Sequence, residues 1–336
     1  MKITRRTFGR TVATLLVSAM ASGAVLSSPA HADNWPNQPI SFVVGFGVGG
    51  GADRFARAVA QFVAPELGVP VTVMNRPGAG GQLAASYVLS RPADGNTLLV
   101  SSLSPYLANS ILHTNANYSL DDFAFVNGQW PDWDLIAART DAGFSSLSEL
   151  LTSIKENPGK HSAAVVQGSA GHLILYMILD AAGVPAENLN IVTYDNGGQC
   201  RAAVAGGQVD FFIIGGLGSD GVVDQIKPLA VMLDKRSDLF DAPTVNEALE
   251  PLGVTVPVVS RATLRGMAAP AAFRTQYPER WAKLVAAYER ALKNPEFLAY
   301  LERNQIGADW IGPDETERQL KEFYTIAERY KDLMGK

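Results

Sequence analysis

The sequence predicts an α/β protein with two domains, because strand-like and helix-like segments alternate along it and because it is long. After an N-terminal leader, about 300 residues remain, which exceeds what one doubly wound sheet usually needs. Short apolar, β-branched runs predict strands at residues 40–46, 71–74, 97–101, 135–138, 162–166, 190–194, 209–214 and 227–233. Helical patterns fall between them at residues 53–64, 82–90, 147–157, 172–182 and 199–205. This alternation predicts mostly parallel sheets covered by helices on both faces.

The last part of the chain is predicted to be helical. Helical patterns cover residues 278–293, 295–304 and 314–334, and Gly312-Pro313-Asp314 precedes the last of them. Proline suits the first turn of a helix, because its missing N–H would have no intrahelical partner there.

The first strand leads into a glycine-rich turn. Residues 40–57 read ISFVVGFGVGGGADRFAR, with five glycines within residues 45–51 and then a helical pattern. Backbone N–H groups at a helix N-terminus have no intrahelical partner, and the helix dipole is positive there. Glycines let an anion approach these donors closely. The segment therefore predicts an anion-binding site made of backbone.

Two later junctions repeat this arrangement more weakly. The strand predicted at 162–166 runs into the small residues of 167–171, and Tyr194 is followed by Asp195-Asn196-Gly197-Gly198. Ligands of open α/β sheets bind at the carboxyl ends of the strands. Two domains with facing glycine turns would form a cleft with backbone donors on both walls.

The first 32 residues resemble an export signal of the Tat type. Arg5 and Arg6 precede an apolar stretch at 12–26, and Ala30-His31-Ala32 has the small residues of a cleavage site. The alternative is a membrane anchor, but the stretch is shorter than the roughly 20 residues of a membrane span. We expect a mature chain that begins near Asp33.

Charge and composition argue against several classes of function. All 33 Asp and Glu but only 24 of the 28 Lys and Arg follow residue 32, so the mature chain carries a net charge of −9. No basic stripe is present, which argues against nucleic acid as a partner. Cys200 is the single cysteine and the histidines are scattered, so we expect no disulfide, no metal site and a buried helical position for Cys200. No catalytic motif stands out.

Several segments together resemble the solute receptors of tripartite tricarboxylate transporters, the Bug family. They are WPNQPI (35–40), FGVGGGADRFAR (46–57), NRPGAGG (75–81), ADGNTLL (93–99), DDFA (121–124), GGQVD (206–210), DAPTVNEA (241–248) and PEF (295–297). Their order and spacing cover nearly the whole mature chain.

The resemblance implies a two-domain, type II periplasmic binding protein with its ligand cleft between the domains. Domain 1 would comprise residues 33–137 and 261–336, and domain 2 residues 138–260. Such a protein is a receptor rather than an enzyme, and it works in the periplasm, as a monomer and without a cofactor. It binds a di- or tricarboxylic or aromatic acid and delivers it to integral-membrane transporter subunits.

By position, the family's ligand contacts fall on two walls. The first wall comprises Phe46, Gly49, Gly50, Gly51, Ala52 and Asp53, and the second Gly168, Ser169, Ala170, Gly171, His172, Asp195 and Asn196. Ser101 and Ser102 end a predicted strand on the cleft side and join the candidates. For Asp53 and His172 a structural role is the alternative.

The chain departs from the family pattern in two segments. Residues 129–133 contain Trp130 and Trp133, and residues 259–266 contain Arg261 and Arg265. We include Trp133 and Arg261 among the candidate ligand contacts, since an aromatic wall and an arginine suit an aromatic or bulky carboxylate. The alternative is that the tryptophans pack the hinge and the arginines are solvated.

An exported, NADP-dependent oxidoreductase is the competing function. Residues 45–50 match the G-x-G-x-x-G dinucleotide fingerprint after a strand. The second strand, however, ends in Asn75-Arg76 and lacks the acidic residue that binds the ribose. A sensor subunit that presents its ligand to a signalling protein would use the same cleft as a transport receptor.

Overall fold

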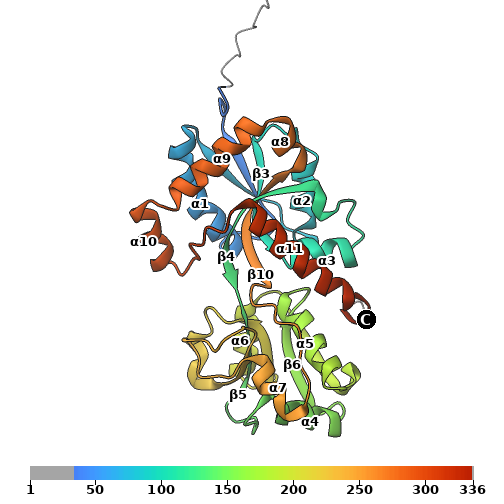
Figure 1. Ribbon diagram of the computed structural model, residues 1–336. Coiled ribbons are helices and arrows are strands. Elements are labelled where there is room, and N and C mark those ends of the chain that lie inside the picture. The colour runs from blue at the N-terminus through green and yellow to red at the C-terminus, as the bar shows by residue number, and fades with distance from the viewer. Residues whose placement is uncertain (1–33, 335–336) are drawn as a thin grey trace, which may run out of the picture. The chain divides into compact units, whose positions relative to one another are not determined.

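The computed structural model describes residues 34–334, so the expected export signal at residues 1–32 lies outside the described residues. From Trp35 onward the chain forms two five-stranded sheets with helices packed beside each (Figure 1). The α/β class is confirmed. Within the described range, none of the helices combines the length and the apolar character that a bilayer span requires.

The first sheet has the strand order β2-β1-β3-β10-β4. Its strands are β1 (Ile40–Val44), β2 (Val71–Asn75), β3 (Thr97–Ser104), β4 (Phe123–Asp132) and β10 (Thr263–Pro270). Strands β2 and β3 run parallel to β1, whereas β10 runs antiparallel to β3 and β4. Strand β1 is apolar on both faces because both faces are covered: Phe42 and Val43, which point to opposite faces, are fully buried.

The second sheet repeats this plan in the order β7-β6-β8-β5-β9. Its strands are β5 (Asp134–Arg139), β6 (His161–Val166), β7 (Leu189–Tyr194), β8 (Phe211–Gly215) and β9 (Ile226–Val231). Strands β7 and β8 are parallel to β6, and β5 is antiparallel to β8 and β9. Both sheets are therefore mixed, but four of the five strands in each run in the same direction, as the prediction of mostly parallel sheets requires. The antiparallel strand in each sheet, β10 or β5, is the one by which the chain enters from the other sheet.

The chain crosses between the sheets twice. Strand β4 ends at Asp132 and β5 begins at Asp134, so Trp133 alone separates the two sheets at the first crossing. The second crossing lies between β9 and β10. Strand β5 pairs with β8 and β9, so residues 134–137, expected in domain 1, belong to the second sheet. The domain limits at 137 and 260 stay a prediction.

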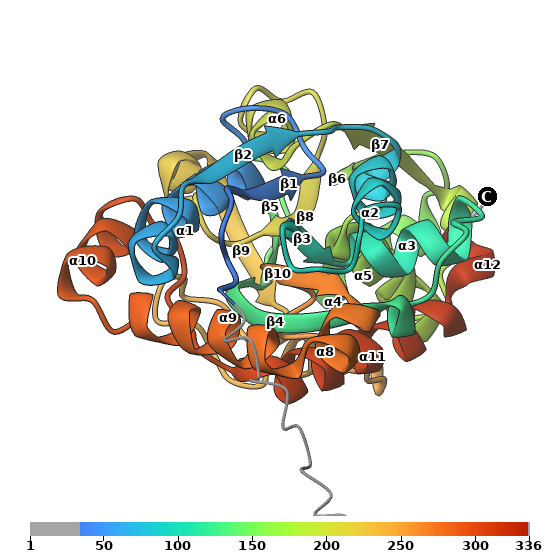
Figure 2. The same cartoon turned by 90° about the horizontal axis from the view of Figure 1, so that it is seen from above.

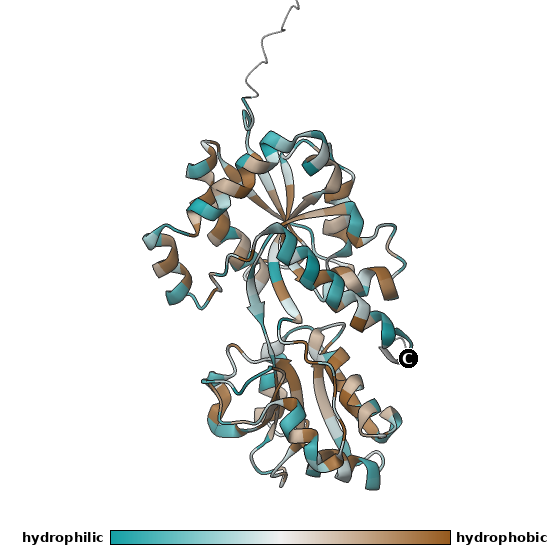
Figure 3. Cartoon of the chain, in the orientation of Figure 1, coloured by the Kyte–Doolittle hydropathy of each residue, from teal (hydrophilic) through white to brown (hydrophobic). Residues whose placement is uncertain are grey.

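The helices divide between the two sheets. Beside the first sheet are α1 (Gly51–Leu67), α2 (Gln82–Leu89), α3 (Tyr106–His113), α8 (Ala271–Gln276), α9 (Pro278–Ala291), α10 (Pro295–Arg303) and α11 (Gly312–Arg329). Beside the second are α4 (Leu147–Glu156), α5 (Ala170–Ala181), α6 (Gly197–Ala205), α7 (Val245–Leu249) and α12 (Lys331–Met334). In Figure 3 the strands of the second sheet are largely hydrophobic, whereas much of α11 is hydrophilic.

Two strands and three helices have no counterpart in the sequence prediction. Strands β4 and β10 contain Gly128, Pro131 and Gly266, which interrupt the alternation that marks a strand. Helices α3, α7 and α8 are too short to show a clear helical period. The two missed strands matter most, because both reach the cavity described below.

Helix α11 is fixed to β4 by one buried amide. The Asn127 side chain is fully buried, and its Oδ1 accepts hydrogen bonds from Ile311 N and Gly312 N at 2.9 and 3.0 Å. Its Nδ2 donates to the Asp309 carbonyl oxygen at 2.9 Å. Figure 2 shows α11 and α8 alongside β4. Asn127 thus gives partners to the free N–H groups that begin a long helix.

We expect Asn127→Ala to lower the free energy of unfolding by about 3 kcal/mol, because it leaves two buried N–H groups without partners. Urea denaturation measures this, and Asn117→Ala at an exposed position is the control, with a change below about 0.5 kcal/mol. A loss below about 1 kcal/mol at Asn127 would show that this amide does not hold the helix.

Candidate functional site

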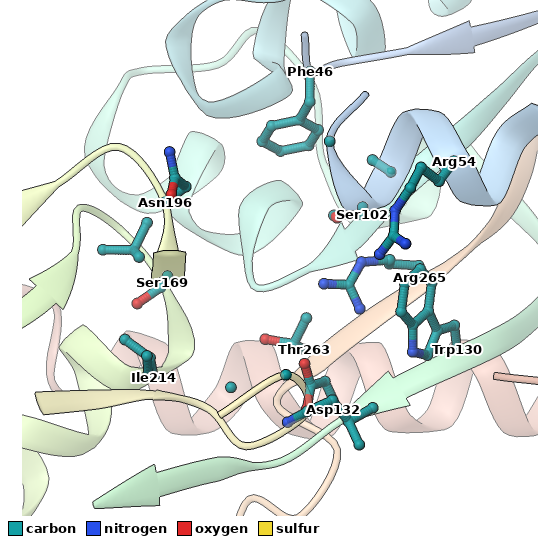
Figure 4. Close-up of a pocket in the computed structure, with 18 of the residues that line it drawn as sticks. Phe46, Arg54, Ser102, Trp130, Asp132, Ser169, Asn196, Ile214, Thr263 and Arg265 are labelled. Atoms are coloured by element: carbon teal, nitrogen blue, oxygen red, sulfur yellow. The ribbon is translucent and has the colours of Figure 1, made fainter. Parts of the chain in front are cut away.

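A cavity of about 660 Å³ opens between the two sheets, where the N-terminal ends of α1, α5 and α6 meet (Figure 4). Its volume lies in the usual range for small-molecule sites, roughly 300–1,000 Å³. It is lined by Phe46, Gly47, Val48, Gly50, Gly51, Ala52, Arg54, Ser102, Tyr106, Trp130, Asp132, Asp134, Val166, Ser169, Asp195, Asn196, Gly197, Arg201, Ile214, Gly215, Leu217, Gly218, Thr263, Arg265 and Gln305. The cavity lies at the carboxyl ends of the parallel strands, as the sequence predicts.

Eight of the candidate ligand contacts line this cavity. They are Phe46, Gly50, Gly51, Ala52, Ser102, Ser169, Asp195 and Asn196. Gly50 is the N-cap of α1 and offers no side chain, so the first N–H groups of that helix are left for an outside acceptor. Whether these residues touch a ligand stays a prediction.

The second wall uses side chains as helix caps. Ser169 caps α5 by accepting from His172 N at 3.2 Å, and Asn196 caps α6 by accepting from Gln199 N at 3.1 Å. A hydroxyl or amide that accepts in this way still has hydrogens of its own to donate. Both caps therefore present donors to the cavity beside a positive helix end.

Asp53 lies behind the glycine turn and outside the lining. Its side chain is buried and accepts from Gly49 N at 2.9 Å, from Arg57 Nε at 2.9 Å and from Asn75 Nδ2 at 2.9 Å. Burial raises the pKa of this carboxyl, but the hydrogen bonds from Arg57, Gly49 and Asn75 outweigh burial and hold the pKa below its ordinary value. Asp53 is thus ionised, and its hydrogen bond from Gly49 N stabilises the glycine turn.

Ser101 and Gly49 are also absent from the residues that line the cavity. Ser101 is buried, and its Oγ accepts from Gly45 N at 3.1 Å, so it fixes the start of the glycine turn. Gly49 has φ of 81°, a left-handed conformation that favours glycine and lets the chain reach the helix. Both residues shape the wall from outside the cavity.

Four residues around the start of α5 pack the fold and do not line the cavity. Gly168 has φ of 66°, and its carbonyl oxygen accepts a hydrogen bond from Asn109 Nδ2. Ala170 is fully buried. A Cβ on Gly171 would lie 2.1 Å from the Ile213 carbonyl oxygen, so only glycine fits there.

His172 is the fourth of these packing residues. Its imidazole is buried and packs at a tilt against the Tyr176 ring, and Gly168 N donates to its Nδ1 at 3.4 Å. Burial, with a smaller contribution from His113, lowers the pKa of His172 to about 4, so the ring is neutral at pH 7.

Trp133 and Arg261 lie away from the cavity. Trp133 packs edge-on against Phe240 and over Gly216 at the crossing between the sheets, which is the packing alternative considered for it. Arg261 precedes β10 and pairs with Asp309 at 3.0 Å in a partly exposed position. The arginine that enters the cavity is Arg265, inside β10.

Arg265, Arg54 and Trp130 form a cluster that the sequence prediction did not select. Arg265 and Trp130 are cross-strand partners of β10 and β4. The Arg265 guanidinium lies 4.1 Å from the centre of the Trp130 ring, and that of Arg54, from the first turn of α1, lies 5.8 Å from it. Figure 4 shows both guanidinium groups over the indole at the edge of the cavity. No local motif marks the cluster, because strand pairing creates it.

The charge of Arg265 lacks a hydrogen-bonding partner. Its Nε and Nη1 atoms are buried and have no partner among the described residues. Burial lowers the pKa of this guanidinium, Asp132 and Tyr106 raise it, and Arg54 lowers it further. A guanidinium stays protonated even so. The site thus holds a partly buried cation with two buried donors that no described residue accepts.

Two buried carboxyl groups face the cavity beside this cluster. Asp132 is 7% exposed and its Oδ1 accepts from Trp133 N at 3.0 Å and Leu217 N at 3.4 Å. Asp134 is 2% exposed, and burial together with the charge of Asp132 raises its pKa to about 8. Asp134 therefore carries a proton at pH 7 when the cavity holds no compensating charge.

Arg201 has a structural role in the lining. Its Nε donates to Ser219 Oγ at 2.9 Å, and its Nη2 donates to the carbonyl oxygens of Gly215 and Leu217 at 3.1 and 2.8 Å. These bonds hold the loop after β8 against α6. The neighbouring Cys200 is fully buried in α6, as predicted.

We expect Gly171→Ala to destabilise the protein by about 1–3 kcal/mol, since the added methyl group collides with the Ile213 carbonyl. Gly221→Ala is the matched control, because a Cβ there meets nothing within 4 Å. Thermal unfolding compares the two. Equal stability of both variants would show that the Ile213 carbonyl does not require glycine at position 171.

The unfolding free energy should depend on pH through Asp134. Between its ordinary pKa of 3.8 and its folded pKa of about 8, the folded state keeps a proton that the unfolded state releases. Stability that the wild type has at pH 4 is therefore lost as the pH rises through 8. Relative to the wild type, Asp134→Asn should gain at least about 1 kcal/mol between pH 5 and 9. A difference that is flat with pH would show that Asp134 is ionised in the empty protein.

Comparison with known proteins agrees with this geometry. Residues 55–325 match the model of the tripartite tricarboxylate transporter family receptor, TctC. BugT of Bordetella pertussis is 30% identical over 251 residues, which cover 72% of this chain and 75% of BugT.

Two solved structures have the same fold with a ligand. MatC from Rhodopseudomonas palustris with bound malate is 25% identical, with a TM-score of 0.70 over 89% of this chain and 99% of MatC. Rpa4515 from R. palustris with adipate is also 25% identical, with a TM-score of 0.70 over 90% and 98% of the two chains. The chain belongs to the receptor family of the tripartite tricarboxylate transporters.

Proposed function

We propose that this protein binds a small organic carboxylate in the cavity between its sheets and delivers it to the membrane subunits of a tripartite tricarboxylate transporter. Malate in MatC and adipate in Rpa4515 support a carboxylate as the ligand class. The family assignment supports a periplasmic receptor, to which the Arg5-Arg6 leader would direct the chain. It also favours a receptor over the oxidoreductase that residues 45–50 suggest.

The observation that carries the proposal is the guanidinium pair of Arg54 and Arg265. Two cations share the Trp130 ring beside the positive end of α1, and Arg265 has buried donors that no residue of the described chain accepts. Like charges held together in this way favour an anion, which would accept hydrogen bonds from the guanidinium and from the first N–H groups of α1. A carboxylate with two coplanar oxygens suits a guanidinium fork.

The same cluster changes the expected role of the tryptophans. Trp130 lines the cavity, but its ring is covered by the Arg265 guanidinium. An aromatic acid would therefore meet the edge-to-face pair of Phe46 and Tyr106, whose centroids are 4.8 Å apart, before it met an indole. This arrangement supports charge recognition over aromatic stacking on tryptophan.

The second wall would complete the site when a ligand is bound. Ser169 and Asn196 would donate from the N-terminal ends of α5 and α6 toward the far side of the ligand. A ligand that contacts both walls would hold the two sheets together around it. Membrane subunits could then distinguish loaded from empty receptor.

We expect Arg265→Gln to weaken binding of malate, adipate or another bound carboxylate 10- to 100-fold, because a charge-assisted hydrogen bond contributes about 1.5–3 kcal/mol. Titration calorimetry measures the affinity, and circular dichroism checks the fold. Arg261→Gln, which removes an arginine paired with Asp309 outside the cavity, is the matched control and should change affinity less than threefold.

The opposite result, a loss at Arg261 with none at Arg265, would place the anion site outside the cavity lining. Failure of a broad panel of organic acids to bind the wild-type protein at millimolar concentration would reject the carboxylate receptor itself.

A further inference from the structure

We propose that an exposed surface beside the first sheet docks an acidic segment of a membrane subunit of the transporter. This surface, the arginine patch, comprises Arg76, Leu83, Tyr87 and Arg91. The inference rests on the proposed function, because its partner is the transporter to which the receptor delivers its ligand. It adds the place and the chemistry of that contact.

Two exposed arginines share one tyrosine ring at the centre of the patch. Arg76 follows β2, and its guanidinium carbon lies 3.7 Å from the centre of the Tyr87 ring. Arg91 follows α2, and its guanidinium carbon lies 4.6 Å from the same centre. Cation–π contact holds both side chains in place. The ring therefore collects two positive charges at one point of the surface.

Neither arginine forms an ion pair with a described residue. Among the described residues, the two guanidinium groups make one hydrogen bond, from Arg76 Nε to Met74 Sδ at 3.3 Å. A thioether is a weak acceptor, and each guanidinium has five N–H donors. Most of these donors are therefore free for an acceptor outside the chain.

The chain around the patch is almost free of acidic residues. Residues 67–120 contain one, Asp94, whereas residues 121–334 contain 29 of the 33 in the whole sequence. Asp53 and Glu66, the two acidic residues before this stretch in the described chain, are paired with arginines. The patch is thus a positive region on a protein of negative net charge. Such a region attracts carboxylates at short range.

An exposed leucine gives the patch an apolar part. Leu83 lies in the first turn of α2 and is 56% exposed. It packs beside Gly78, since a Cβ on that glycine would be 2.6 Å from Leu83 Cδ1. A protein segment that carries carboxylates and an apolar side chain can use both parts of the patch. A free inorganic anion would use the arginines alone.

The number of cations favours a protein over a membrane as the occupant. Anionic bilayers are bound by clusters of about four to eight Lys and Arg. Residues 34–138 contain no lysine and only four arginines, and two of these, Arg54 and Arg57, lie over Trp130 and in an ion pair with Asp53. The remaining two form the patch, which is enough for one or two carboxylates.

A loop of unusual backbone conformation joins the patch to the cavity wall. Residues 78–81 all have positive φ, which is costly and is kept where function requires it. A Cβ on Gly81 would lie 3.5 Å from the Phe46 ring, and one on Gly80 would lie 3.8 Å from the Tyr106 ring. Both rings line the cavity. A segment docked on the patch is therefore one loop away from the proposed ligand.

The test separates ligand binding from delivery. In the bacterium that encodes the protein, the double variant Arg76→Glu, Arg91→Glu replaces the wild type, and uptake is measured for a labelled acid that the purified wild type binds. We expect uptake to fall at least tenfold, because both cations become repulsive to an acidic partner. By titration calorimetry the purified variant should bind the acid within threefold of the wild-type affinity, and immunoblotting should show equal amounts of protein.

A second double variant, Arg303→Glu, Arg329→Glu, is the matched control. Both arginines are exposed, form no ion pair with a described residue and lie on α10 and α11, outside the patch. This variant has the same change in net charge and should keep uptake within twofold of the wild type. The conservative variant Arg76→Lys, Arg91→Lys keeps the charge and should restore at least a third of the uptake.

Four results would overturn the inference while the proposed function stands. Wild-type uptake by the Arg76→Glu, Arg91→Glu variant would remove the docking surface, and an equal loss in the control would make the effect one of net charge. A loss of carboxylate affinity equal to the loss of uptake would place the arginines in the ligand site. Sedimentation of the wild type, but not of the variant, with vesicles of equal parts phosphatidylethanolamine and phosphatidylglycerol would make the membrane the occupant.

One further result would reject the proposed function itself. If deletion of the gene leaves the uptake of every acid that the protein binds unchanged, the protein is not a transport receptor. The inference then fails with it, because its partner is a transporter subunit.

Discussion

An excess of positive charge at the N-terminus of α1 is the constraint on which the rest of the site depends. The guanidinium groups of Arg54 and Arg265 and the positive end of a 17-residue helix face one cavity, and Arg265 has buried donors that no described residue accepts. Residues 33–336 carry a net charge of −9, so their overall field repels anions. A ligand anion must therefore be attracted by charges close to it, because salt screens the interactions between more distant charges. The Trp130 ring holds the two cations together and stabilises them by cation–π contact.

The topology explains why the charged groups gather at this place. In each sheet four of the five strands run in one direction, and α1 in the first sheet and α5 and α6 in the second begin at the cavity after the carboxyl ends of such strands. The antiparallel strand in each sheet starts at the crossing, so the first residues of β5 and β10 also lie there. Asp134 and Arg265 reach the cavity for this reason, the first on β5 and the second on β10. Backbone donors come from the helices that follow parallel strands, whereas the charges of Asp134 and Arg265 come from the crossing strands and that of Arg54 from α1.

Sequence reasoning found the parts of the site that local patterns encode. The glycine turn before α1 and the caps Ser169 and Asn196 follow directly from strand, small residues and helix in succession. The same patterns could not show that Gly50 and Gly171 have different roles. Gly50 lines the cavity, whereas Gly171 must be glycine because a Cβ there would collide with the Ile213 carbonyl.

The charged half of the site depends on long-range pairing. Arg265 meets Trp130 because β10 pairs with β4, across 135 residues of chain, and neither strand shows a clear alternating pattern. Arg261 and Arg265 are equivalent as sequence, and only the register decides that the second enters the cavity. Likewise, nothing local distinguishes the buried Asp134 from an exposed aspartate. The charged cluster that we propose as the ligand site is thus a property of the assembled sheets.

The most direct test of the central claim is a crystal structure of the protein with its bound carboxylate. The account predicts carboxylate oxygens within hydrogen-bonding distance of the Arg265 guanidinium and of the first N–H groups of α1, with Trp130 still beneath the arginine. A carboxylate held only by the second wall, with the Arg265 donors still free of it, would contradict the account.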